Sequence, residues 1–293
     1  MMSAEPDAAV KAARSGGREP IALKRLLPPG EALSIPELIA QLGLSEAGAQ
    51  SERPHLLLNM ISTADGRATL GGRSGPLSNP ADRALFHGLR SAVDAVMVGA
   101  GTVRAERYGR LIADPRVRSD RRERGLSEEP LACIVSGRLE LAADIPLLAT
   151  PEARVAIITN SEATLPDAAA HVEYVRAIRD GALDLPAAMT ELRGRFSVRT
   201  LLCEGGPHLN AHLLADGLVD ELFLALAPKL AGGDPASGEA LRIVAGPPLA
   251  EPAELLLMSM LAQDSYVFAR YCVRSSPPDR VARVTTSSSS LAR

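Results

Sequence analysis

The 293-residue chain contains no tryptophan, and aromatic residues make up only 3% of it. Base-stacking platforms and aromatic sugar-binding clefts depend on such side chains, so both are disfavoured. The formal net charge is only −3, which gives no strong field to attract nucleic acid or an anionic membrane. The composition therefore favours a small-molecule substrate over nucleic acid or a membrane as partner.

Cysteine is also scarce. The three residues, Cys133, Cys203 and Cys272, lie far apart and form no CxxC motif, as is typical of reduced thiols in a cytoplasmic protein. Long apolar runs are missing, so no transmembrane helix is expected, and the N-terminus lacks the apolar core of a secretory signal. Zinc-deaminase, HExxH, GxSxG and Walker A signatures are absent too, and no metal site is predicted.

Hydrophobic residues make up 46% of the chain, enough to bury a sizeable core. We expect an N-terminal tail and extension over residues 1–53, with a disordered tail over residues 1–20. The main domain is expected over residues 54–274, and a disordered C-terminal tail over residues 275–293. The extension contains a short amphipathic segment, residues 35–44, that is expected to pack on the main domain.

Within the main domain, apolar runs typical of strands alternate with helical segments. This alternation predicts an α/β fold with a mostly parallel central sheet and helices on both faces. The last two strands follow each other without a clear helix, which predicts an antiparallel edge. The expected strands are residues 56–62, 92–98, 132–136, 155–159, 172–175, 200–204, 221–227 and 266–272, and the expected helices are residues 80–91, 102–107, 162–169, 185–195 and 207–215.

Ligands of such sheets bind at the carboxyl ends of the strands, so motifs that directly follow strands are candidates for ligand binding. After the first strand, Asp65-Gly66 stands where a Rossmann fold would have a glycine-rich loop. The carboxylate could bind a polar substrate or supply a proton. A plain turn is an equally good interpretation of Asp65-Gly66 alone. The missing glycine loop disfavours a Rossmann-type dehydrogenase.

Two further motifs place glycines between a strand and a helix: Gly99-Ala-Gly101-Thr102, and Glu204-Gly205-Gly206-Pro207-His208. Free N–H groups at a helix start attract phosphate. On neighbouring strand ends, two such turns could hold a dinucleotide pyrophosphate. The alternative, simple strand-to-helix turns, stays open because a single GxG motif is weak. For the His208 side chain, a surface or capping role is the better interpretation.

A fourth motif is the loop of residues 72–79, which leads into the helix that carries Arg90. Arg90 lies near the end of that helix, where a cation is stabilised by the helix dipole whether or not it binds a ligand. The charged run of residues 116–124 is interpreted as a solvated loop or helix face.

Taken in order, these motifs resemble the reductase domain of the riboflavin-biosynthesis deaminase/reductase family over roughly residues 54–273. The residues that carry the resemblance are Asn59, Ser62, Ala64-Asp65-Gly66-Arg67, Asn79-Pro80, Leu89-Arg90, residues 98–103, Glu204-Gly205-Gly206-Pro207, residues 217–221 and Ala227-Pro228-Lys229. The resemblance implies a dihydrofolate-reductase-like fold, NADPH as cofactor and a homodimer. It also implies reduction of a 5-amino-6-(5-phosphoribosylamino)uracil-like substrate, with hydride transfer to the ribosyl C1 carbon.

The resemblance also implies roles for individual residues. Asp65 is the expected catalytic residue, as proton donor or polariser. The expected substrate contacts are Asn59, Ser74, Arg90 and Glu204, and the expected NADPH contacts are Ser62, Pro76, Ser78, Gly99, Gly101, Thr102, Ser136, Gly205, Gly206, Pro207, His208 and Leu209. The 2′-phosphate of NADPH is expected near residues 136–138 or 159–161.

The chain departs from the family pattern in two places. Gly75-Pro76 stands where an aromatic residue is frequent, and residues 104–109 replace an Ala-Asp-Asp-Pro segment. The second departure bears on recognition of the phosphoribosyl group. Two other functions remain open: a dihydrofolate or pteridine-type reductase, and an NADPH-binding protein of the same fold without turnover.

Overall fold

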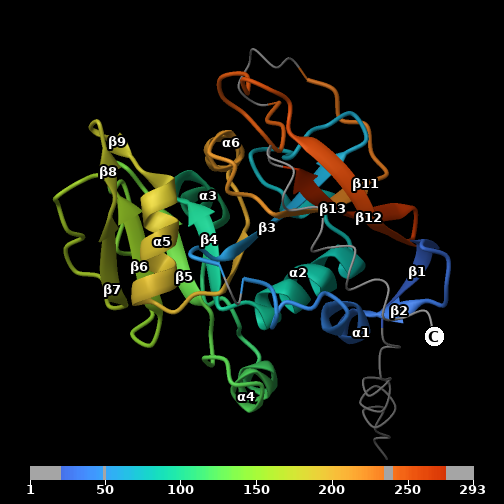
Figure 1. Ribbon diagram of the computed structural model, residues 1–293, viewed down its shortest axis with the longest axis horizontal. Helices are drawn as coiled ribbons and strands as arrows, with labels where there is room; N and C mark the ends of the chain where they lie inside the picture. The colour runs from blue at the N-terminus through green and yellow to red at the C-terminus, as the bar shows by residue number, and fades with distance from the viewer. Residues whose placement is uncertain (1–20, 49–50, 234–239, 275–293) are drawn as a thin grey trace, which may run out of the picture.

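The computed structural model describes residues 21–48, 51–233 and 240–274. An eleven-stranded sheet runs through it in the order β2-β1-β12-β13-β11-β3-β10-β4-β5-β6-β7 (Figure 1). The strands are β1 (Ala22–Leu27), β2 (Leu33–Ser34), β3 (His55–Thr63), β4 (Ala95–Gly99), β5 (Leu131–Val135), β6 (Arg154–Thr159), β7 (His171–Arg176), β10 (Thr200–Cys203), β11 (Glu221–Ala227), β12 (Glu254–Gln263) and β13 (Tyr266–Arg274). The short strands β8 (Ile178–Arg179) and β9 (Ala182–Leu183) form a separate antiparallel pair.

The strands from β11 to β7 in this order run parallel to one another. On the other side of β11, strands β13, β12, β1 and β2 continue the sheet in antiparallel pairs. The predicted mostly parallel sheet with an antiparallel edge is therefore confirmed. The carboxyl ends of β3, β10, β4, β5 and β6 lie along one edge, which brings the strand-end motifs of the sequence together.

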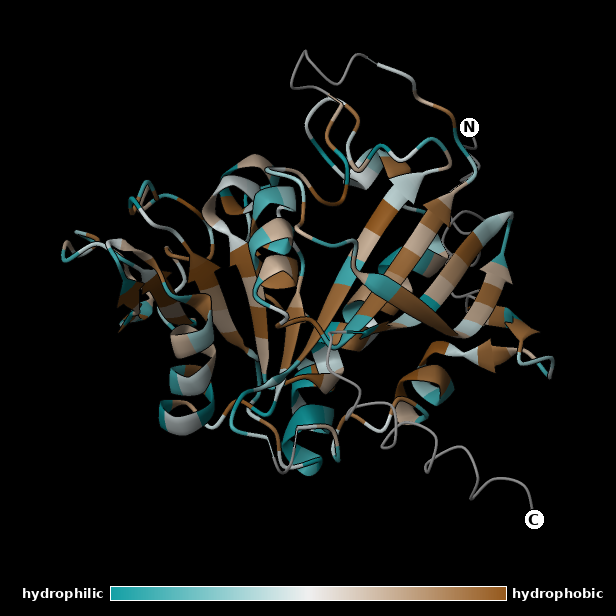
Figure 2. Cartoon of the chain, turned by 45° about the horizontal axis from the view of Figure 1, so that its top comes forward, coloured by the Kyte–Doolittle hydropathy of each residue, from teal (hydrophilic) through white to brown (hydrophobic). Residues whose placement is uncertain are grey.

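Helices cover both faces of the sheet. The helices are α1 (Ile35–Ala40), α2 (Pro80–Ala92), α3 (Ala100–Glu106), α4 (Pro115–Glu123), α5 (Leu185–Arg195) and α6 (Pro207–Ala215). Buried side chains of α1, α2 and α3 share one hydrophobic cluster with one set of strand residues, and those of α5 and α6 share a second cluster with the alternate set. Figure 2 shows the central strands as largely hydrophobic, as a sheet buried on both faces requires. Among the described helices, none combines the length and apolar composition needed to cross a membrane.

Helix α2 illustrates how local sequence positions the site. The Asn79 side chain accepts a hydrogen bond from the backbone N–H of Asp82 at 2.8 Å, and Pro80 occupies the first turn. Ala81, Leu85 and Leu89, at intervals of four residues, are buried against the sheet. The helix therefore begins at a defined residue and presents a defined face to the core.

The charged run of residues 116–124 differs in part from its prediction. It forms most of α4, and Arg121 is wholly buried rather than solvated. The Arg121 guanidinium donates to the backbone carbonyls of Arg90, Ser91 and Val93 at 2.9–3.2 Å. Arg121 thus satisfies carbonyl groups at the C-terminal end of α2, which have no partner within the helix.

The predicted helix over residues 162–169 is wrong, because this segment connects β6 to β7 without helical structure. Instead, side chains of β7 form hydrogen bonds with the backbone of this segment. Arg176 donates to the carbonyls of Ser161, Glu162 and Ala163, and the Tyr174 hydroxyl accepts from the N–H of Leu165. Hydrogen bonds to side chains of β7 therefore take the place of the backbone hydrogen bonds that a helix would form.

Besides the two-residue strands β2, β8 and β9, two longer strands were not expected from the sequence, β1 and β12. They pair with each other, and β12 also pairs with β13. The N-terminal extension thereby contributes a strand to the sheet, and its amphipathic segment forms α1, which packs on α2. The tails predicted for residues 1–20 and 275–293 lie outside the described residues.

Candidate active site

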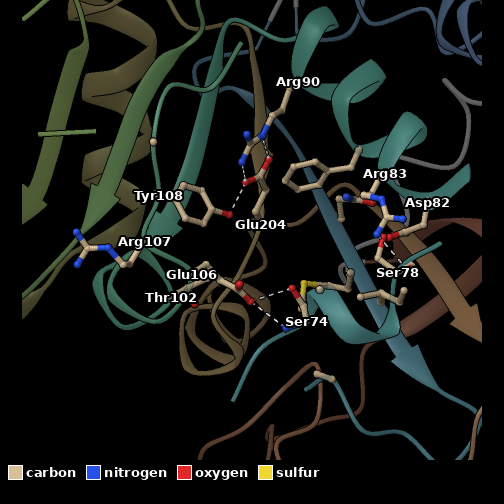
Figure 3. A pocket seen from close by; sticks show the side chains of 17 residues that line it. Ser74, Ser78, Asp82, Arg83, Arg90, Thr102, Glu106, Arg107, Tyr108 and Glu204 are labelled. Atoms are coloured by element: carbon tan, nitrogen blue, oxygen red, sulfur yellow. Dashed lines mark hydrogen bonds and ion pairs between the residues drawn. The ribbon is translucent and has the colours of Figure 1, made fainter. Parts of the chain in front are cut away.

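A cavity of about 340 Å³ lies beside the carboxyl-terminal end of the parallel sheet. Strand β3 lines it with Asn59, Met60 and Ile61. One face of α2 lines it on one side, and α3 and the loop after it on the other (Figure 3). The polar and charged side chains around it are Ser74, Ser78, Asp82, Arg83, Arg90, Thr102, Glu106, Arg107, Tyr108 and Glu204.

The most buried polar group of this cavity is an ion pair between Arg90 of α2 and Glu204, which follows β10. The Nε atom of Arg90 lies 2.7 Å from Glu204 Oε1, and its Nη2 atom lies 2.7 Å from Oε2. The Tyr108 hydroxyl donates to Oε2 at 2.6 Å. Three segments far apart in the sequence thus meet at one carboxylate, which has donors on both oxygens.

Burial and charge determine the protonation of this cluster. Burial raises the pKa of the Tyr108 hydroxyl well above its usual value, and the charge of Glu204 raises it further. Tyr108 is therefore a neutral hydrogen-bond donor. Burial alone would lower the pKa of Arg90, but Glu204 outweighs this effect and the pKa is raised. The Arg90 guanidinium also lies over the Phe86 ring, 4.2 Å from its centroid.

A second carboxylate, Glu106 at the end of α3, ties two sides of the cavity together. Its Oε1 atom accepts from the backbone N–H of Ser74 at 2.8 Å and from the Ser74 hydroxyl at 3.0 Å. This contact holds the loop of residues 72–79 against α3 (Figure 3). Glu106 belongs to the segment that departs from the family pattern.

A third carboxylate, Asp82, lies in the first turn of α2 and is half-buried. Burial raises the pKa of Asp82, while a hydrogen bond from the Ser78 side chain and the charge of Arg83 lower it in part. Asp82, Phe86 and Arg90 are spaced four residues apart, so all three lie on the face of α2 that lines the cavity.

The two glycine turns lie directly against each other. The Gly99 N–H donates to the Gly205 carbonyl at 2.8 Å, and a Cβ on Gly206 would lie 2.8 Å from Thr102 Oγ1. Gly205 has a φ of +86°, which favours glycine. Helix α6 begins with Pro207 after Gly206, and the N–H groups that follow in its first turn have no side-chain cap. These residues fit a bound phosphate group, as a dinucleotide cofactor requires.

Most of the predicted site residues lie at the cavity or in the glycine turns beside it. All four predicted substrate contacts, Asn59, Ser74, Arg90 and Glu204, line the cavity. Of the predicted cofactor contacts, Ser78 and Thr102 line it too. Gly99, Gly101, Gly205, Gly206 and Pro207 form the adjoining turns.

The remaining predicted cofactor contacts lie around these turns. His208 is exposed on α6, whereas Leu209 is buried in the hydrophobic cluster beneath that helix. Ser62 and Ser136 are buried at strand ends, and Pro76 lies in a short 3-10 turn, Gly75–Leu77. The carbonyl of Pro76 accepts from Lys229 Nζ at 2.6 Å.

Asp65 is not among the residues that line the cavity. Its carboxylate accepts from the Thr63 hydroxyl and from the backbone N–H groups of Ala231 and Gly232, at 3.0 Å and 2.6 Å to Oδ2. These hydrogen bonds, that from Thr63 first, lower the pKa of Asp65. Asp65 is therefore ionised and joins the strand-end turn to residues 231–232.

Several cavity residues were not predicted as site residues, among them Asp82, Glu106 and Tyr108. The spacing of Asp82, Phe86 and Arg90 is a signal that the sequence contains, because residues four apart share a helix face. No comparable signal marks Tyr108, which reaches Glu204 across 96 residues of sequence.

A comparison with solved structures identifies the fold of the chain. A pyrimidine reductase-like protein from Corynebacterium diphtheriae superposes with a TM-score of 0.64, at 24% identity, over 76% of this chain and 93% of that one. This likeness shows the fold, which is dihydrofolate-reductase-like as expected.

The family model of the RibD C-terminal domain matches residues 54–250, and the chain belongs to this family. The 2,5-diamino-6-ribosylamino-4(3H)-pyrimidinone 5′-phosphate reductase of Methanothermobacter thermautotrophicus is 30% identical over 184 residues, which cover 62% of this chain and 81% of that protein. The riboflavin biosynthesis protein RibD of Actinobacillus pleuropneumoniae is 28% identical over 66% of this chain, and the match spans only 51% of that longer protein. The chain is accordingly an oxidoreductase.

Proposed function

We propose that this protein is an NADPH-dependent reductase of a ribosylaminopyrimidine 5′-phosphate. The observation that carries the proposal is the position of the Arg90–Glu204–Tyr108 cluster at a cavity that adjoins two glycine turns. A polar cavity with room for a small molecule thereby lies next to two glycine turns, and backbone of this kind suits a phosphate group. The named activity of the archaeal relative supports this choice of substrate class.

Bound NADPH would supply hydride for the ribosyl C1 carbon. The chain's own groups would orient the substrate for that transfer. Asn59, Ser74 and the Arg90–Glu204 pair would contact the sugar and phosphate, because they line the cavity and offer donors and acceptors. Asp65 lies outside this lining and is ionised because its pKa is lowered, so as a catalytic group it would act through its charge rather than as a proton donor.

The cofactor proposal rests on the backbone between β10 and α6. The N–H groups at the start of α6 would take the pyrophosphate, beside Gly99 and Gly101. Selection of NADPH over NADH would come from Arg138, whose side chain is 88% exposed after β5. Thr159 at the end of the neighbouring β6 donates to the Gly137 carbonyl, so the two predicted 2′-phosphate segments lie side by side.

We also propose a homodimer that forms through the antiparallel part of the sheet. Strand β12 carries apolar residues that stay partly uncovered, among them Leu255 at 44% and Leu256 at 37% exposure. Leu26 and Leu27 of the adjacent β1 are exposed to a similar degree. An apolar strand surface of this kind is typical of a subunit interface. Sedimentation at several concentrations tests the proposal, and a monomer throughout would refute it.

The activity is tested by following NADPH oxidation with purified protein. The substrates are the two 5′-phosphates that differ at C2 of the pyrimidine, the 2-amino-4-oxo form and the uracil form, with dihydrofolate as a third. We expect turnover with a ribosylaminopyrimidine phosphate and tighter binding of NADPH than of NADH by titration calorimetry.

Other outcomes would separate the alternatives. Turnover of dihydrofolate alone would make the protein a pteridine-type reductase. Tight NADPH binding without any turnover would make it a binding protein of the same fold. Equal affinity for NADH and NADPH would refute the cofactor assignment and leave the substrate assignment standing.

A further inference from the structure

A second cavity, also of about 340 Å³, lies at the amino-terminal edge of the parallel sheet. Strands β4, β5, β6 and β10 begin at this edge, and α4 lies beyond it, at the bottom of Figure 1. Strand β4 runs from this edge to the glycine turns over five residues, or roughly 13–16 Å. The two cavities share no lining residue, so the function proposed above does not account for this one.

Positive charge exceeds negative charge among the side chains that line this second cavity. Arg154 is the first residue of β6, Arg193 lies in the last turn of α5, and Arg199 directly precedes β10. The carboxylate among the lining residues is Asp94, which directly precedes β4. Three guanidinium groups from three segments of the chain therefore surround one small space.

Asp94 leaves donors of these arginines available. Its Oδ2 atom accepts from the backbone N–H groups of Arg199 and Thr200 at 2.9 Å each, and from the Thr200 hydroxyl at 3.0 Å. The Nε atom of Arg199 is 4.0 Å from the same oxygen, which is too long for a hydrogen bond. The Arg154 side chain forms no hydrogen bond or ion pair with the residues that the structure describes. Two guanidinium groups thus retain donors for a ligand.

A fourth arginine, Arg121, lies behind the wall of the cavity. Its Nε atom donates to the carbonyl of Ser127, a lining residue, at 2.8 Å. Arg121 is wholly buried, and its Nη2 atom has no hydrogen-bond partner in the described part of the chain. Burial and the charge of Arg124 lower the pKa of Arg121 to about 10, so the side chain is charged at neutral pH. A buried charge that is bound only by carbonyl groups adds positive potential to the space beside it.

The remaining walls of the cavity indicate the size and kind of ligand. Leu126, Leu131, Phe196 and Val198 supply apolar surface beside the guanidinium groups. The volume lies within the range of small-molecule sites and exceeds what a single inorganic ion fills. A guanidinium group matches the geometry of a phosphate, to which it can donate two parallel hydrogen bonds. The lining therefore suits a compact organic molecule that carries a phosphate group.

We propose that this cavity is a second ligand site, which binds a phosphorylated small molecule. Arg154 and Arg199 contact its phosphate group, and Phe196 contacts its apolar part. The bound anion also compensates the buried charge of Arg121. The proposal does not depend on the reductase function, because the two cavities lie at opposite edges of the sheet.

A purely structural role for these arginines makes a different prediction. A cation in the last turn of a helix, such as Arg193, is stabilised by the helix dipole without any ligand. Exposed arginines at strand ends interact with anions only by screening, which is weak and does not saturate. Saturable binding that depends on particular lining residues thus separates a site from a charged surface.

The experiment is an NMR titration of the full-length, ¹⁵N-labelled protein with phenyl phosphate at constant ionic strength. The backbone amides of Gly125, Ser127 and Ser197 report on this cavity, because all three residues line it. Their shifts should saturate with one dissociation constant. Inorganic phosphate should bind about 10-fold more weakly, because it leaves the apolar walls uncovered. The amides of Gly99 and Gly101 report separately on any binding at the glycine turns.

Arg154→Gln and Arg199→Gln should each raise the dissociation constant at this cavity about 10-fold, as expected for the loss of a charge-assisted hydrogen bond. Arg116→Gln is the matched control, because Arg116 is exposed on α4 and does not line the cavity. It removes the same charge and should leave the dissociation constant unchanged. Shifts that do not saturate, or a constant that is the same in wild type and in both cavity variants, would overturn the proposal. Since no turnover is measured, failure of the reductase function would leave this result standing.

Discussion

Arg90 and Glu204, 114 positions apart in the chain, form a buried two-point ion pair at the floor of the cavity. The pair joins α2 to the segment between β10 and α6. Breaking a buried pair leaves one charge without its partner, which costs more than the pair itself contributes.

We therefore expect Glu204→Gln to lower the free energy of unfolding by about 3–5 kcal/mol. The double variant Arg90→Met/Glu204→Gln should regain part of this loss, because no uncompensated charge stays buried. Tyr108→Phe removes one hydrogen bond to the carboxylate and should cost less, about 1.5–3 kcal/mol. Urea unfolding of the four proteins measures these values. A double variant less stable than Glu204→Gln alone would show that the pair is not the main source of the effect.

Gly101 offers a test of the proposed cofactor site that leaves the fold intact. A Cβ at Gly101 would meet no atom of the protein within 4 Å, whereas a Cβ at Gly206 would press on Thr102. Gly101→Ala should leave stability unchanged or raise it by up to about 1 kcal/mol, as alanine does within a helix. It should weaken NADPH binding by about 10-fold, since the methyl group enters the space of the ligand.

Gly194→Ala is the matched control for Gly101→Ala. Gly194 is also helical, on α5, and its Cβ would likewise meet open space. It should change stability in the same way and leave the dissociation constant of NADPH unchanged. If both variants bind NADPH like wild type, the space beside Gly101 does not hold the cofactor.

Asp65→Asn tests whether the strand-end carboxylate takes part in the reaction. As a polariser of the developing charge, Asp65 should contribute on the order of 10²-fold to kcat. Its amide replacement should preserve NADPH affinity, because the hydrogen bonds of the Asp65 carboxylate go to Thr63, Ala231 and Gly232 and not to the glycine turns. Stopped-flow measurement of single-turnover hydride transfer gives the rate directly. An unchanged rate would show that Asp65 has no catalytic role and only holds residues 231–232 through hydrogen bonds.

The pH dependence of stability should reflect Glu221 at the start of β11. Burial would raise its pKa, but hydrogen bonds from His55 and Arg270 outweigh burial and lower the pKa to about 2. A carboxyl whose pKa is lower in the folded state stabilises the protein above its unfolded pKa. That contribution should therefore be complete above about pH 4.5 and be lost as the pH falls toward 2.

Comparison of wild type with Glu221→Gln isolates this contribution. The difference in free energy of unfolding should shrink as the pH falls below 5 toward 2, as measured by urea titration at each pH. Glu254→Gln is the control, because the Glu254 side chain is exposed and its ion pair with Arg274 is long, at 3.7 Å. A difference for Glu221→Gln that does not change with pH would contradict the assignment.

Much of the fold is predictable from local sequence. Apolar runs gave the positions of the parallel strands, and Asn79-Pro80 indicated where α2 begins. These features depend on neighbours in the chain. Residues 162–169 contain helix-forming residues too, but Arg176 and Tyr174 bind their backbone from β7. The apolar run of β12 has no local feature that separates a strand from a helix, and pairing with β1 and β13 makes it a strand.

The candidate site, too, is determined partly by local sequence and partly by tertiary contacts. The order and spacing of the sequence determined that Gly99, Gly205 and Gly206 stand between strands and helices, and the family resemblance implied that Arg90 and Glu204 contact the substrate. Only the tertiary structure decided that Arg90 binds Glu204, that Tyr108 donates to the same carboxylate, and that Asp65 accepts hydrogen bonds from residues 231–232. Each of these contacts joins residues brought together by strand order in the sheet, and spacing along the chain does not encode which distant donor reaches a given carboxylate.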